Sequence, residues 1–518
     1  MTLIMHCGRF LVVAIIAYWG VVGSAVGQSA RRDGLWTVVH DDKARVDVHT
    51  MEITIHPASE PLPALKYELI PGPAERLPGN AAIHYLKALG FFERDSVRER
   101  IIQFRREQLE QLKQRGADSV SAAPPMIWLE QRPDEIPLEE VKQYLSYFSF
   151  QVRYLKEAAS RDRFDMDRQI ERLSDLYRYP LTEVQVMREL ARTQSLRLRV
   201  ALAEHRMDDA LEILGQQFAL ARHLGQDEFL VSNLVGMAIA KIAWQDALLF
   251  VQEPEAPSLY WAIARLPKPL VSTERAMDNE RNFVFQQFDK LREVDTRPRP
   301  AGYWRKFFEE VWADFALFDE LVLGIRLPTG RPEYVQMGSA AFVIAAYPGA
   351  RRYLRDQWRM SEKQLDDYPT AQVVALATVR FYEQWRDEYF KWFSLPLSEA
   401  RRYSQFQTLG RRFDRAAREI GPAALLANTM LPALDAFQTA STRTDDALNM
   451  LAAVEAIRLF AGKHGKLPDS LDDLDVPAHV IVGSSGPLRY RREGDRGVLI
   501  GNTFPGVRYQ LVLKLSPR

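Results

Sequence analysis

The chain has 518 residues, enough for several domains, and its charged and apolar fractions of 26% and 47% are those of an ordinary globular protein. Lysine plus arginine and aspartate plus glutamate number 68 each, so the formal net charge is zero. No net field then attracts nucleic acid, and we expect no nucleic-acid partner.

The N-terminus follows the three-part pattern of a secretory signal peptide, which we place at residues 1–27. Arg9 precedes an apolar run from Phe10 to Val22, and small residues follow up to Gly27. We predict cleavage near Gly27 and an exported protein, periplasmic or extracellular. Since the single cysteine is Cys7, the mature chain would be cysteine-free, which excludes thiolate metal sites and cysteine nucleophiles. The alternative is an N-terminal helix that is retained as an anchor.

Residues 28–75 are predicted to form a short extended or β segment. The stretch from Leu35 to Ile55 is rich in Val, Thr and Ile with partial alternation, which predicts two strands. From residue 76 to residue 440 helical periodicity predominates. Apolar residues spaced four and three apart predict an amphipathic helix over Leu138–Ser160, and a more charged helix precedes it at Arg98–Gln114.

Two helices, Glu183–Glu204 and Asp208–His223, are predicted to form a hairpin that resembles a tetratricopeptide unit at its turn. The following stretch, Phe229–Val251, is apolar on all sides, and such a helix is typically buried. Lys241 and Asp246 would be costly in a bilayer, so we interpret this stretch as the central helix of the core rather than as a membrane span.

A predicted helix from Thr273 to Val294 is followed by TRPRP at 296–300, the best candidate for a hinge within the helical body. Two aromatic helices come next, with rings spaced four and three residues apart. The first carries Trp304, Phe308, Val311, Phe315, Phe318 and Val322, and the second carries Tyr382, Trp385, Tyr389 and Trp392. We interpret both as an aromatic core between packed helices. Insertion of the rings into a membrane surface is the alternative.

The tail, residues 441–518, is predicted to be a C-terminal α+β domain. Thr444 would cap a helix over Asp445–Ala461. Three strands follow, and the last, Val507–Leu515, alternates apolar and polar residues, so a helix on a small antiparallel sheet is expected. The predicted fold class is mainly α: an irregular, solenoid-like helical body with a short N-terminal β segment and a small C-terminal α/β domain.

Several stretches together resemble a functionally uncharacterised family of secreted proteins of planctomycete-type bacteria. They are PGNAAIHYLKAL, NLVGMAIAKIAWQDALLFVQEPEAPSLYWAIARLPKPLV, YPTAQ, RDEYFKWFSLP, MLPALDAF and AAVEAIRLFAGKHGKLPDSLDDLDVP. The resemblance implies export and a helical body, and it implies no catalytic residue because the family has none assigned. The segment IRLFAGKHGKLPDSLDDL is also similar to the helix-to-sheet junction of type II secretion pseudopilins. The N-terminus lacks a prepilin leader, so only a shared shape of the tail is implied.

Motifs with a known mechanism are missing from the sequence: there is no phosphate-binding GxxxxGKS/T or GxGxxG, no HExxH and no GxSxG. His40, His49 and His56 lie close in sequence, but on a regular strand the last two would face opposite sides, so we expect no metal site. We expect no cofactor either. Carboxylates occur in four pairs, and helix capping explains three of them better than a glycosidase site does: Asp208–Asp209, Asp366–Asp367, Asp445–Asp446 and Asp472–Asp473.

Three polar residues on apolar helix faces are the candidate site residues. Glu280 lies between Met277 and Val284 on the apolar stripe of the helix predicted from Thr273. A carboxylate at such a position is costly unless it is paired. An ion pair with Arg275, Arg281 or a residue of a neighbouring helix is the favoured role, and a catalytic carboxylate is the alternative. Asn233 and Lys241 in the central helix could line a polar binding pocket, although a satisfied core network is the more common outcome.

The function predicted from these features is that of a secreted, helix-rich binding or structural protein of the cell envelope, with an unknown protein or glycan as its partner. No catalytic motif supports an enzyme, so a hydrolase that uses carboxylates, Glu280 among them, is the alternative. A peripheral membrane protein that uses the aromatic helices is the second alternative. We expect no membrane association once the signal peptide is removed.

Overall fold

The computed structural model describes residues 30–90, 103, 107, 110, 124–170, 179, 181–322, 331–395, 397–400, 402–481 and 486–517. The predicted signal peptide and most of the predicted helix at 98–114 lie outside the described residues. By their internal contacts these residues form two compact units. We call the described residues within Val22–Asp167, Leu181–Ala276 and Thr439–Arg518 the sheet unit. We call those within Arg168–Pro180 and Met277–Gln438 the helical unit.

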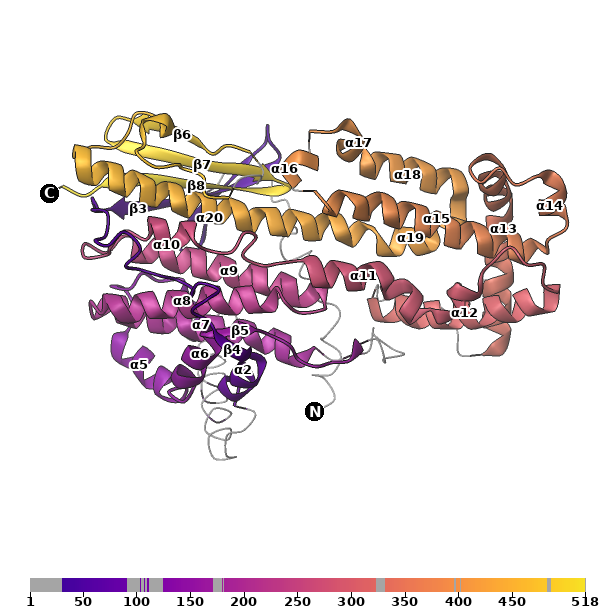
Figure 1. Cartoon of the computed structure of the whole chain (residues 1–518), viewed down its shortest axis with the longest axis horizontal. Coiled ribbons are helices and arrows are strands. Elements are labelled where there is room, and N and C mark those ends of the chain that lie inside the picture. Colours follow the sequence, from indigo (N-terminus) through magenta and orange to yellow (C-terminus); the bar gives the residue numbers. More distant parts are fainter. Residues whose placement is uncertain are drawn as a thin grey trace. The chain divides into compact units, whose positions relative to one another are not determined.

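A six-stranded sheet lies in the sheet unit (Figure 1). Its strands stand in the order β1 (Arg31–Asp33), β2 (Trp36–Asp41), β3 (Val46–Ile55), β8 (Gly506–Leu515), β7 (Arg496–Phe504) and β6 (Arg489–Glu493). The predicted alternation of β8 is confirmed, since Val507, Tyr509, Leu511 and Leu513 are all buried. Helices α9 (Leu230–Phe250) and α20 (Pro432–His464) pack on this buried face, α9 with Trp244 against Tyr509 and α20 with Met450 beside Gly501.

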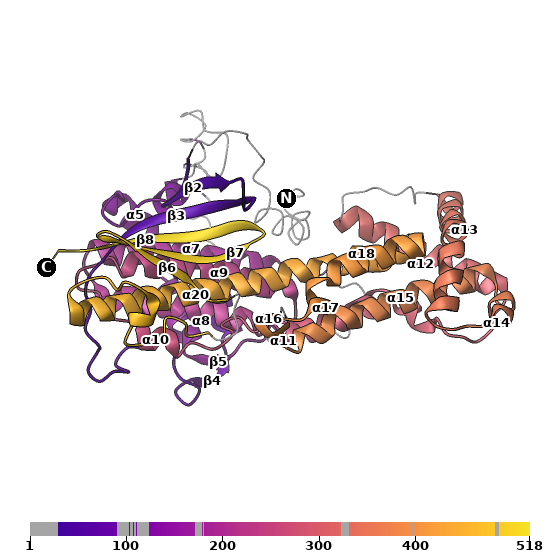
Figure 2. The ribbon, with the colours of Figure 1, turned by 90° about the horizontal axis from the view of Figure 1, so that it is seen from above.

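The sheet is mixed, whereas the sequence predicts an antiparallel tail sheet and a separate N-terminal segment. β3 pairs with β8 in parallel along its whole length, from Val46 opposite Gly506 to Ile55 opposite Leu515. The other neighbouring strands are antiparallel. Figure 2 shows β3, in indigo, beside β8, in yellow. The expectation failed because strand pairing depends on backbone hydrogen bonds in space, which the distance between two strands along the chain does not restrict.

Three long helices of the sheet unit pack against one another: α7 (Thr182–Ala203), α8 (Met207–Leu224) and α9. The predicted helical hairpin is present, and most of the central helix is buried as predicted, although Val231, Ala238, Lys241, Ile242 and Gln245 form a half-buried stripe along one side. Gly236 lets α9 approach α8 closely, because a Cβ atom there would lie 3.0 Å from the Ala221 carbonyl oxygen. Among the described residues, no helix combines the length and the apolar character that crossing a bilayer requires.

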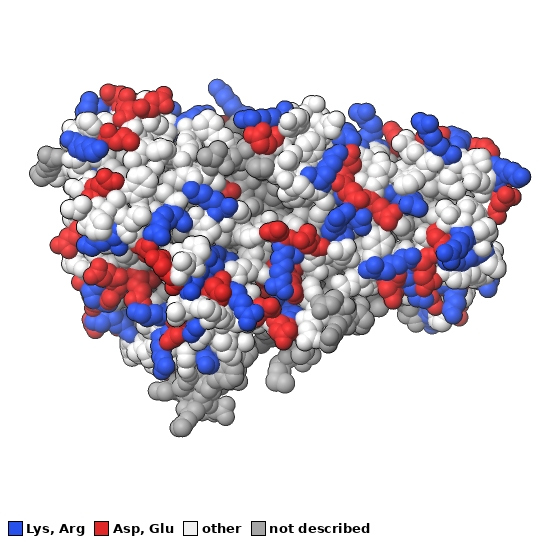
Figure 3. All heavy atoms as spheres, viewed as in Figure 1, with Lys and Arg blue, Asp and Glu red and all other residues white. Residues whose placement is uncertain are grey.

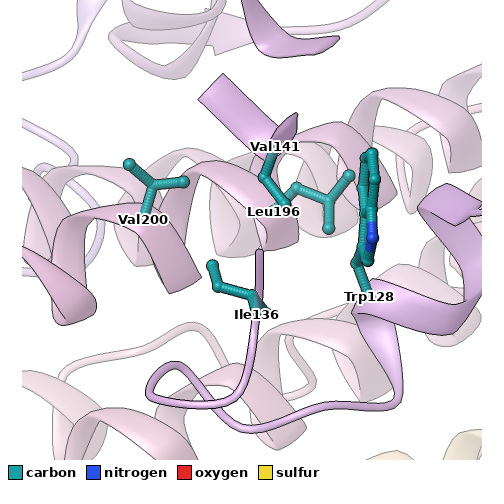
Figure 4. Packing of buried hydrophobic residues seen from close by; sticks show 5 residues of the cluster. All are labelled: Trp128, Ile136, Val141, Leu196 and Val200. Atoms are coloured by element: carbon teal, nitrogen blue, oxygen red, sulfur yellow. The ribbon is translucent and has the colours of Figure 1, made fainter. Parts of the chain in front are cut away.

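Shorter elements complete the sheet unit: β4 (Leu77–Asn80), α2 (Ala82–Ala88), α4 (Pro124–Leu129), α5 (Leu138–Ser146), α6 (Gln151–Ala159), β5 (Arg161–Arg163), α10 (Tyr260–Ala264) and η5 (Leu471–Asp473). The single helix predicted over 138–160 was wrong, because a turn separates α5 from α6 and leaves Val152 exposed. α5 instead contributes to a small core with α4 and α7. Figure 4 shows its members: Trp128, Ile136, Val141, Leu196 and Val200.

The helical unit contains elements from the greater part of α11 (Glu274–Gln287) to the start of α20. In chain order they are η3 (Asp289–Glu293), α12 (Ala301–Val322), α13 (Pro332–Asp356), α14 (Glu362–Asp366), α15 (Thr370–Phe393), α16 (Leu397–Ala400), α17 (Ser404–Gln407), α18 (Leu409–Ile420), η4 (Gly421–Ala424) and α19 (Leu425–Met430). The predicted aromatic helices are α12 and α15, and the side chains of Phe318 and Val322 in the predicted stripe lie outside the described part of the structure. The chain is mainly α, as predicted, and α13 is the long helix that the sequence analysis did not identify.

Helix α20 begins well before the predicted start at Asp445, since it runs without a break from Pro432. Thr444 is therefore not a cap. Its hydroxyl donates a hydrogen bond to the Ala440 carbonyl within the helix. Two acidic residues that we placed in a first turn, Asp445 and Asp446, consequently lie inside the helix.

Candidate binding site

An apolar pocket lies within the helical unit, and we call it the aromatic pocket. Its cavity volume is about 50 Å³, and its mouth opens to solvent. Five elements supply its wall, from the start of η3 through α12, α13 and α15 to α19. The lining residues are Phe288, Leu291, Phe307, Phe308, Val311, Trp312, Phe315, Phe342, Ala375, Thr378, Val379, Leu425 and Leu426.

The spacing of apolar residues on α12 builds one side of the pocket. Phe308, Val311 and Phe315 follow one another at intervals of three and four, so they share one face of the helix. Trp304 begins the same stripe and is fully buried, and its indole N–H donates to the side-chain oxygen of Gln372 on α15 at 3.0 Å. This bond fixes α12 against α15 and so fixes the position of the rings.

Contacts between aromatic rings connect α12 to α13 in the wall of the pocket. The centroid of Phe342 on α13 lies 6.0 Å from that of Phe308 and 5.7 Å from that of Trp312. Gly338 on α13 leaves room for the indole, because a Cβ atom there would lie 2.7 Å from the Trp312 Nε1. The rings hold one another at distances typical of aromatic pairs, so the pocket is preformed.

The wall of the pocket presents no polar surface. Thr378 is the lining residue with a hydroxyl, and its Oγ1 is buried without a hydrogen-bond partner among the described residues. Such a wall attracts apolar groups through the hydrophobic effect and offers little to a ligand with many hydroxyls. The pocket suits an alkyl chain or an aromatic ring.

Glu280, the catalytic candidate, lies on α11 in the helical unit, half-buried, on the stripe that Met277, Val284 and Phe288 bury as predicted. The ion pair that we favoured for Glu280 is not formed with any described residue. Both candidate arginines are engaged elsewhere: Arg281 pairs with Asp387 at 3.5 Å.

The second candidate arginine, Arg275, pairs with Glu228 and lies 3.7 Å from Asp165 in the sheet unit. Burial without a compensating cation raises the pKa of Glu280 to about 7. Burial also raises the pKa of Tyr382 on α15, and the charge of Glu280 raises it further. Glu280 is thus a carboxylate that exchanges its proton near neutral pH beside a tyrosine, which is the character of a general acid or base.

The two binding candidates in the central helix do not meet. Asn233 is fully buried, and its amide donates to the Leu224 carbonyl at 3.0 Å. Lys241 is half-buried, with its ammonium group 5.3 Å from the ring centroid of Tyr509. Eight residues of α-helix separate them by roughly 12 Å along the axis, so one small pocket would not hold both.

A buried polar network elsewhere on α9 was not recognised in the sequence. Asp246 accepts hydrogen bonds from Ser195 Oγ at 2.7 Å, Arg199 Nη1 at 3.1 Å and Gln217 Nε2 at 2.7 Å. Burial raises the pKa of Asp246, while Arg199 and the hydrogen bonds oppose that shift. The carboxylate has a donor from each neighbouring helix, so the network is structural.

The histidines near the N-terminus take separate positions. His40 lies 2.8 Å from the Asp47 carboxylate, which raises its pKa, and the ring of His49 lies against Tyr509. Burial lowers the pKa of His56. Within the described ranges, no group of three or more His, Cys, Asp or Glu side chains is arranged to hold a metal ion.

Two of the acidic pairs occupy helix starts as predicted, Asp208–Asp209 in the first turn of α8 and Asp472–Asp473 in η5. The prediction was wrong for Asp445 and Asp446, which lie within α20. Asp446 accepts hydrogen bonds from the backbone N–H and the amide of Asn502 on β7. Burial and the neighbouring charge of Asp446 raise the pKa of Asp445 to about 7.

Comparison with protein-family models, with curated protein sequences and with solved structures gives no match to this chain. The resemblances to secreted planctomycete-type proteins and to pseudopilins therefore stay predictions. The site has to be interpreted from its own chemistry.

Proposed function

We propose that this chain is an exported, helix-rich binding protein that holds an apolar ligand, an alkyl chain or an aromatic ring, in the aromatic pocket of its helical unit. The observation that carries this proposal is a preformed pocket with six aromatic rings in its wall and no polar surface. The sequence analysis expected a protein or a glycan as partner, and we now propose an apolar ligand instead of a glycan. The hydroxyls of a glycan would lose their hydrogen bonds to water on entering such a pocket.

Export and an envelope location remain part of the proposal. Their support is the signal-peptide pattern at residues 1–27 together with a mature chain that would contain no cysteine. The solenoid-like stacking of the helical body belongs to the proposal as well, supported by the hairpin of α7 and α8 and by the packing of α9 on both.

A displacement experiment tests ligand binding. The mature protein is titrated with the neutral fluorophore N-phenyl-1-naphthylamine, and hexadecanoic acid is added as competitor. We expect saturable fluorescence enhancement that the fatty acid reverses. Val311→Trp, which places a second indole in the pocket, should weaken binding by at least about tenfold, since the indole fills space in which the ligand would bury its apolar surface.

Arg305→Trp is the matched control, because residue 305 is exposed on the same helix and does not line the pocket. It should bind as the wild type does. Circular dichroism of both variants shows whether α12 is intact. Equal binding by the wild type and Val311→Trp, or no saturable binding by the wild type, contradicts the proposal.

One observation favours a second candidate function, a hydrolase that uses Glu280 as its general acid or base. The half-buried carboxylate has a pKa of about 7 and no ion pair among the described residues. The test is hydrolysis of a panel of p-nitrophenyl esters and glycosides. Glu280→Gln should lower any activity by about a hundredfold or more. Asp278→Asn, at an exposed position of the same helix, should leave it unchanged.

A further inference from the structure

Helix α13 exposes an apolar face. Three large side chains on it are far from buried: Tyr334 is 44% exposed, Met337 68% and Ile344 73%. Ala341, Ala345 and Pro348 are exposed as well. At about 100° per residue these six positions fall within one sector of roughly 100°, so they form one continuous stripe along the helix.

The opposite face of α13 packs into the helical unit. Ser339, Ala346 and Ala350 are buried there, and Gly349 lies so close to the end of α18 that a Cβ atom would be 2.0 Å from the Ile420 carbonyl oxygen. A surface helix of a globular protein normally carries polar residues on its outer face. α13 is apolar on both faces, which indicates that the outer face has a partner.

Charge indicates what kind of partner. From Tyr334 to Ala350 the helix has no charged residue, a length of about 25 Å. Arg331 before this stretch and Arg352 after it are both exposed, and so is Glu333, which lies between Arg331 and Tyr334. An apolar stripe between two cations is the pattern of a helix that lies in a lipid interface, with its cations at the phosphate groups and a tyrosine near the headgroups. Elsewhere charges of both signs are mixed over the surface, as the face in Figure 3 shows.

The aromatic pocket supplies an independent argument for lipid. Phe342 on α13 is one of its lining residues, so the helix that exposes the apolar stripe also forms part of the pocket wall. A chain drawn from a bilayer at α13 would have a short path to the pocket. A pocket that binds alkyl chains, next to a surface that inserts into a membrane, is what a lipid-binding protein needs.

We propose that α13 docks the protein on a lipid membrane surface, with Tyr334, Met337 and Ile344 inserted among the acyl chains, and that the pocket ligand is the acyl chain of a membrane lipid. The second part rests on the proposed binding function. The proposed membrane surface is therefore α13 and not the two aromatic helices considered in the sequence analysis. The rings of α12 and α15 lie in the interior: Trp304, Phe315, Tyr382, Trp385 and Tyr389 are all buried.

Co-sedimentation with vesicles tests the docking surface. The mature protein is mixed with vesicles of phosphatidylethanolamine and phosphatidylglycerol and, in parallel, of phosphatidylcholine alone. We expect binding to both, stronger to the anionic vesicles because of the two arginines. Binding to phosphatidylcholine should persist at about 1 M salt, where charges are screened within about 3 Å. Met337→Glu combined with Ile344→Glu should lower the partition coefficient by at least about tenfold.

Val152→Glu combined with Val186→Glu is the matched control. These valines are 47% and 37% exposed on α6 and α7, so the double variant adds the same charge at exposed apolar positions away from α13. It should sediment as the wild type does. Both variants replace exposed side chains, and thermal unfolding verifies that their folds are kept.

The outcomes separate the two proposals. Wild-type protein that stays in the supernatant with both vesicles, or an α13 variant that sediments fully, overturns the docking surface. A wild-type dimer in light scattering that the α13 variant dissociates, without vesicle binding, assigns the stripe to a second copy and also overturns it. Vesicle binding without displacement of N-phenyl-1-naphthylamine by hexadecanoic acid leaves the docking surface standing and contradicts the pocket function alone.

Discussion

Helix α9 of the sheet unit and helix α13 of the helical unit are both apolar around most of their circumference, yet their surroundings differ. α9 carries a carboxylate, Asp246, and is mostly buried, with three donors around that carboxylate. α13 carries no charge over its central part and leaves Met337 and Ile344 exposed. The number of charges in a helix therefore does not reveal whether it is buried. What matters is whether each polar group has a partner and whether each apolar face has one.

Carboxylates repeat this contrast. Asp246 in the sheet unit is fully bonded, whereas Glu280 in the helical unit has no ion pair among the described residues. The helical unit also contains the aromatic pocket, in whose wall the Thr378 hydroxyl has no hydrogen-bond partner among the described residues. Buried atoms without a described hydrogen-bond partner also occur in the sheet unit, Asn233 Oδ1 and Trp244 Nε1 among them, so it is the apolar pocket that leads us to place the function in the helical unit.

The largest expected effect comes from breaking the ion pair that makes Asp246 tolerable in α9. Arg199→Met should lower the free energy of unfolding by about 3 to 5 kcal/mol, because it leaves a buried charge without its cation. Arg192→Met, at a more exposed pair with Glu189, should cost at most about 1 kcal/mol. Urea unfolding monitored by circular dichroism measures both. An Arg199→Met variant as stable as Arg192→Met would mean that the hydrogen-bond network of Asp246 does not stabilise the packing of α9.

The next effect concerns pH and sharpens the contrast between Asp246 and Glu280. Since burial raises the pKa of Glu280 from 4.5 to about 7, the folded state binds a proton that the unfolded state has lost. Stability should therefore fall as pH rises from about 4.5 to about 7, by up to about 3 kcal/mol, and remain low above that range.

Glu280→Gln should remove this part of the pH dependence and stabilise the protein at pH 8. The measurement is the urea midpoint at several pH values for the wild type and the variant. Asp445, with a pKa also raised to about 7, contributes in the same direction, so the comparison must be the difference between the two proteins. Parallel pH profiles would contradict the assignment of Glu280.

The two faces of α13 should respond differently to small substitutions. Gly349→Ala places a Cβ atom against the Ile420 carbonyl and should cost about 1 to 3 kcal/mol, since backbone has to move. Met337→Ala on the exposed face should change stability by no more than about 0.5 kcal/mol. Thermal unfolding of the two variants measures the difference. Equal costs would show that the outer face of α13 is covered within the protein itself.

The smallest effect is expected in the aromatic pocket. Thr378→Val replaces a buried hydroxyl that has no partner with a methyl group of similar size, so stability should stay the same or rise by up to about 1 kcal/mol. Binding of N-phenyl-1-naphthylamine should stay the same or tighten slightly. A clear loss of stability would reveal a hydrogen bond to this hydroxyl and would make the pocket less apolar than proposed.

Much of the local structure could be predicted from the sequence. The all-round apolar stretch at 229–251 became the buried helix α9, the aromatic spacing on α12 and α15 became core, and the alternation of Val507 to Leu513 became one face of β8. Each of these patterns is a periodicity of neighbouring residues, and periodicity specifies both the type of element and the face that is buried.

The candidate site could be predicted only in part. Glu280 was recognised because a carboxylate on an apolar stripe is unusual, but its lack of a cation depended on where Arg275 and Arg281 found their partners. The pocket was missed, and of its six aromatic residues the sequence analysis named only Phe308 and Phe315. α13 was missed because Gly338, Pro348 and Gly349 interrupt the helical pattern, although the long stretch without a charge was a signal.

What the sequence by itself determined is which segments are helices or strands and which of their faces are apolar. Tertiary structure alone decided that β3 pairs with β8 across most of the chain, that five elements leave a space lined by rings, and that one apolar face of α13 stays exposed. The physical reason is that apolar periodicity is a local property. The partner of a strand, a charge or an apolar face comes from distant segments, whose approach depends on the packing of the whole unit.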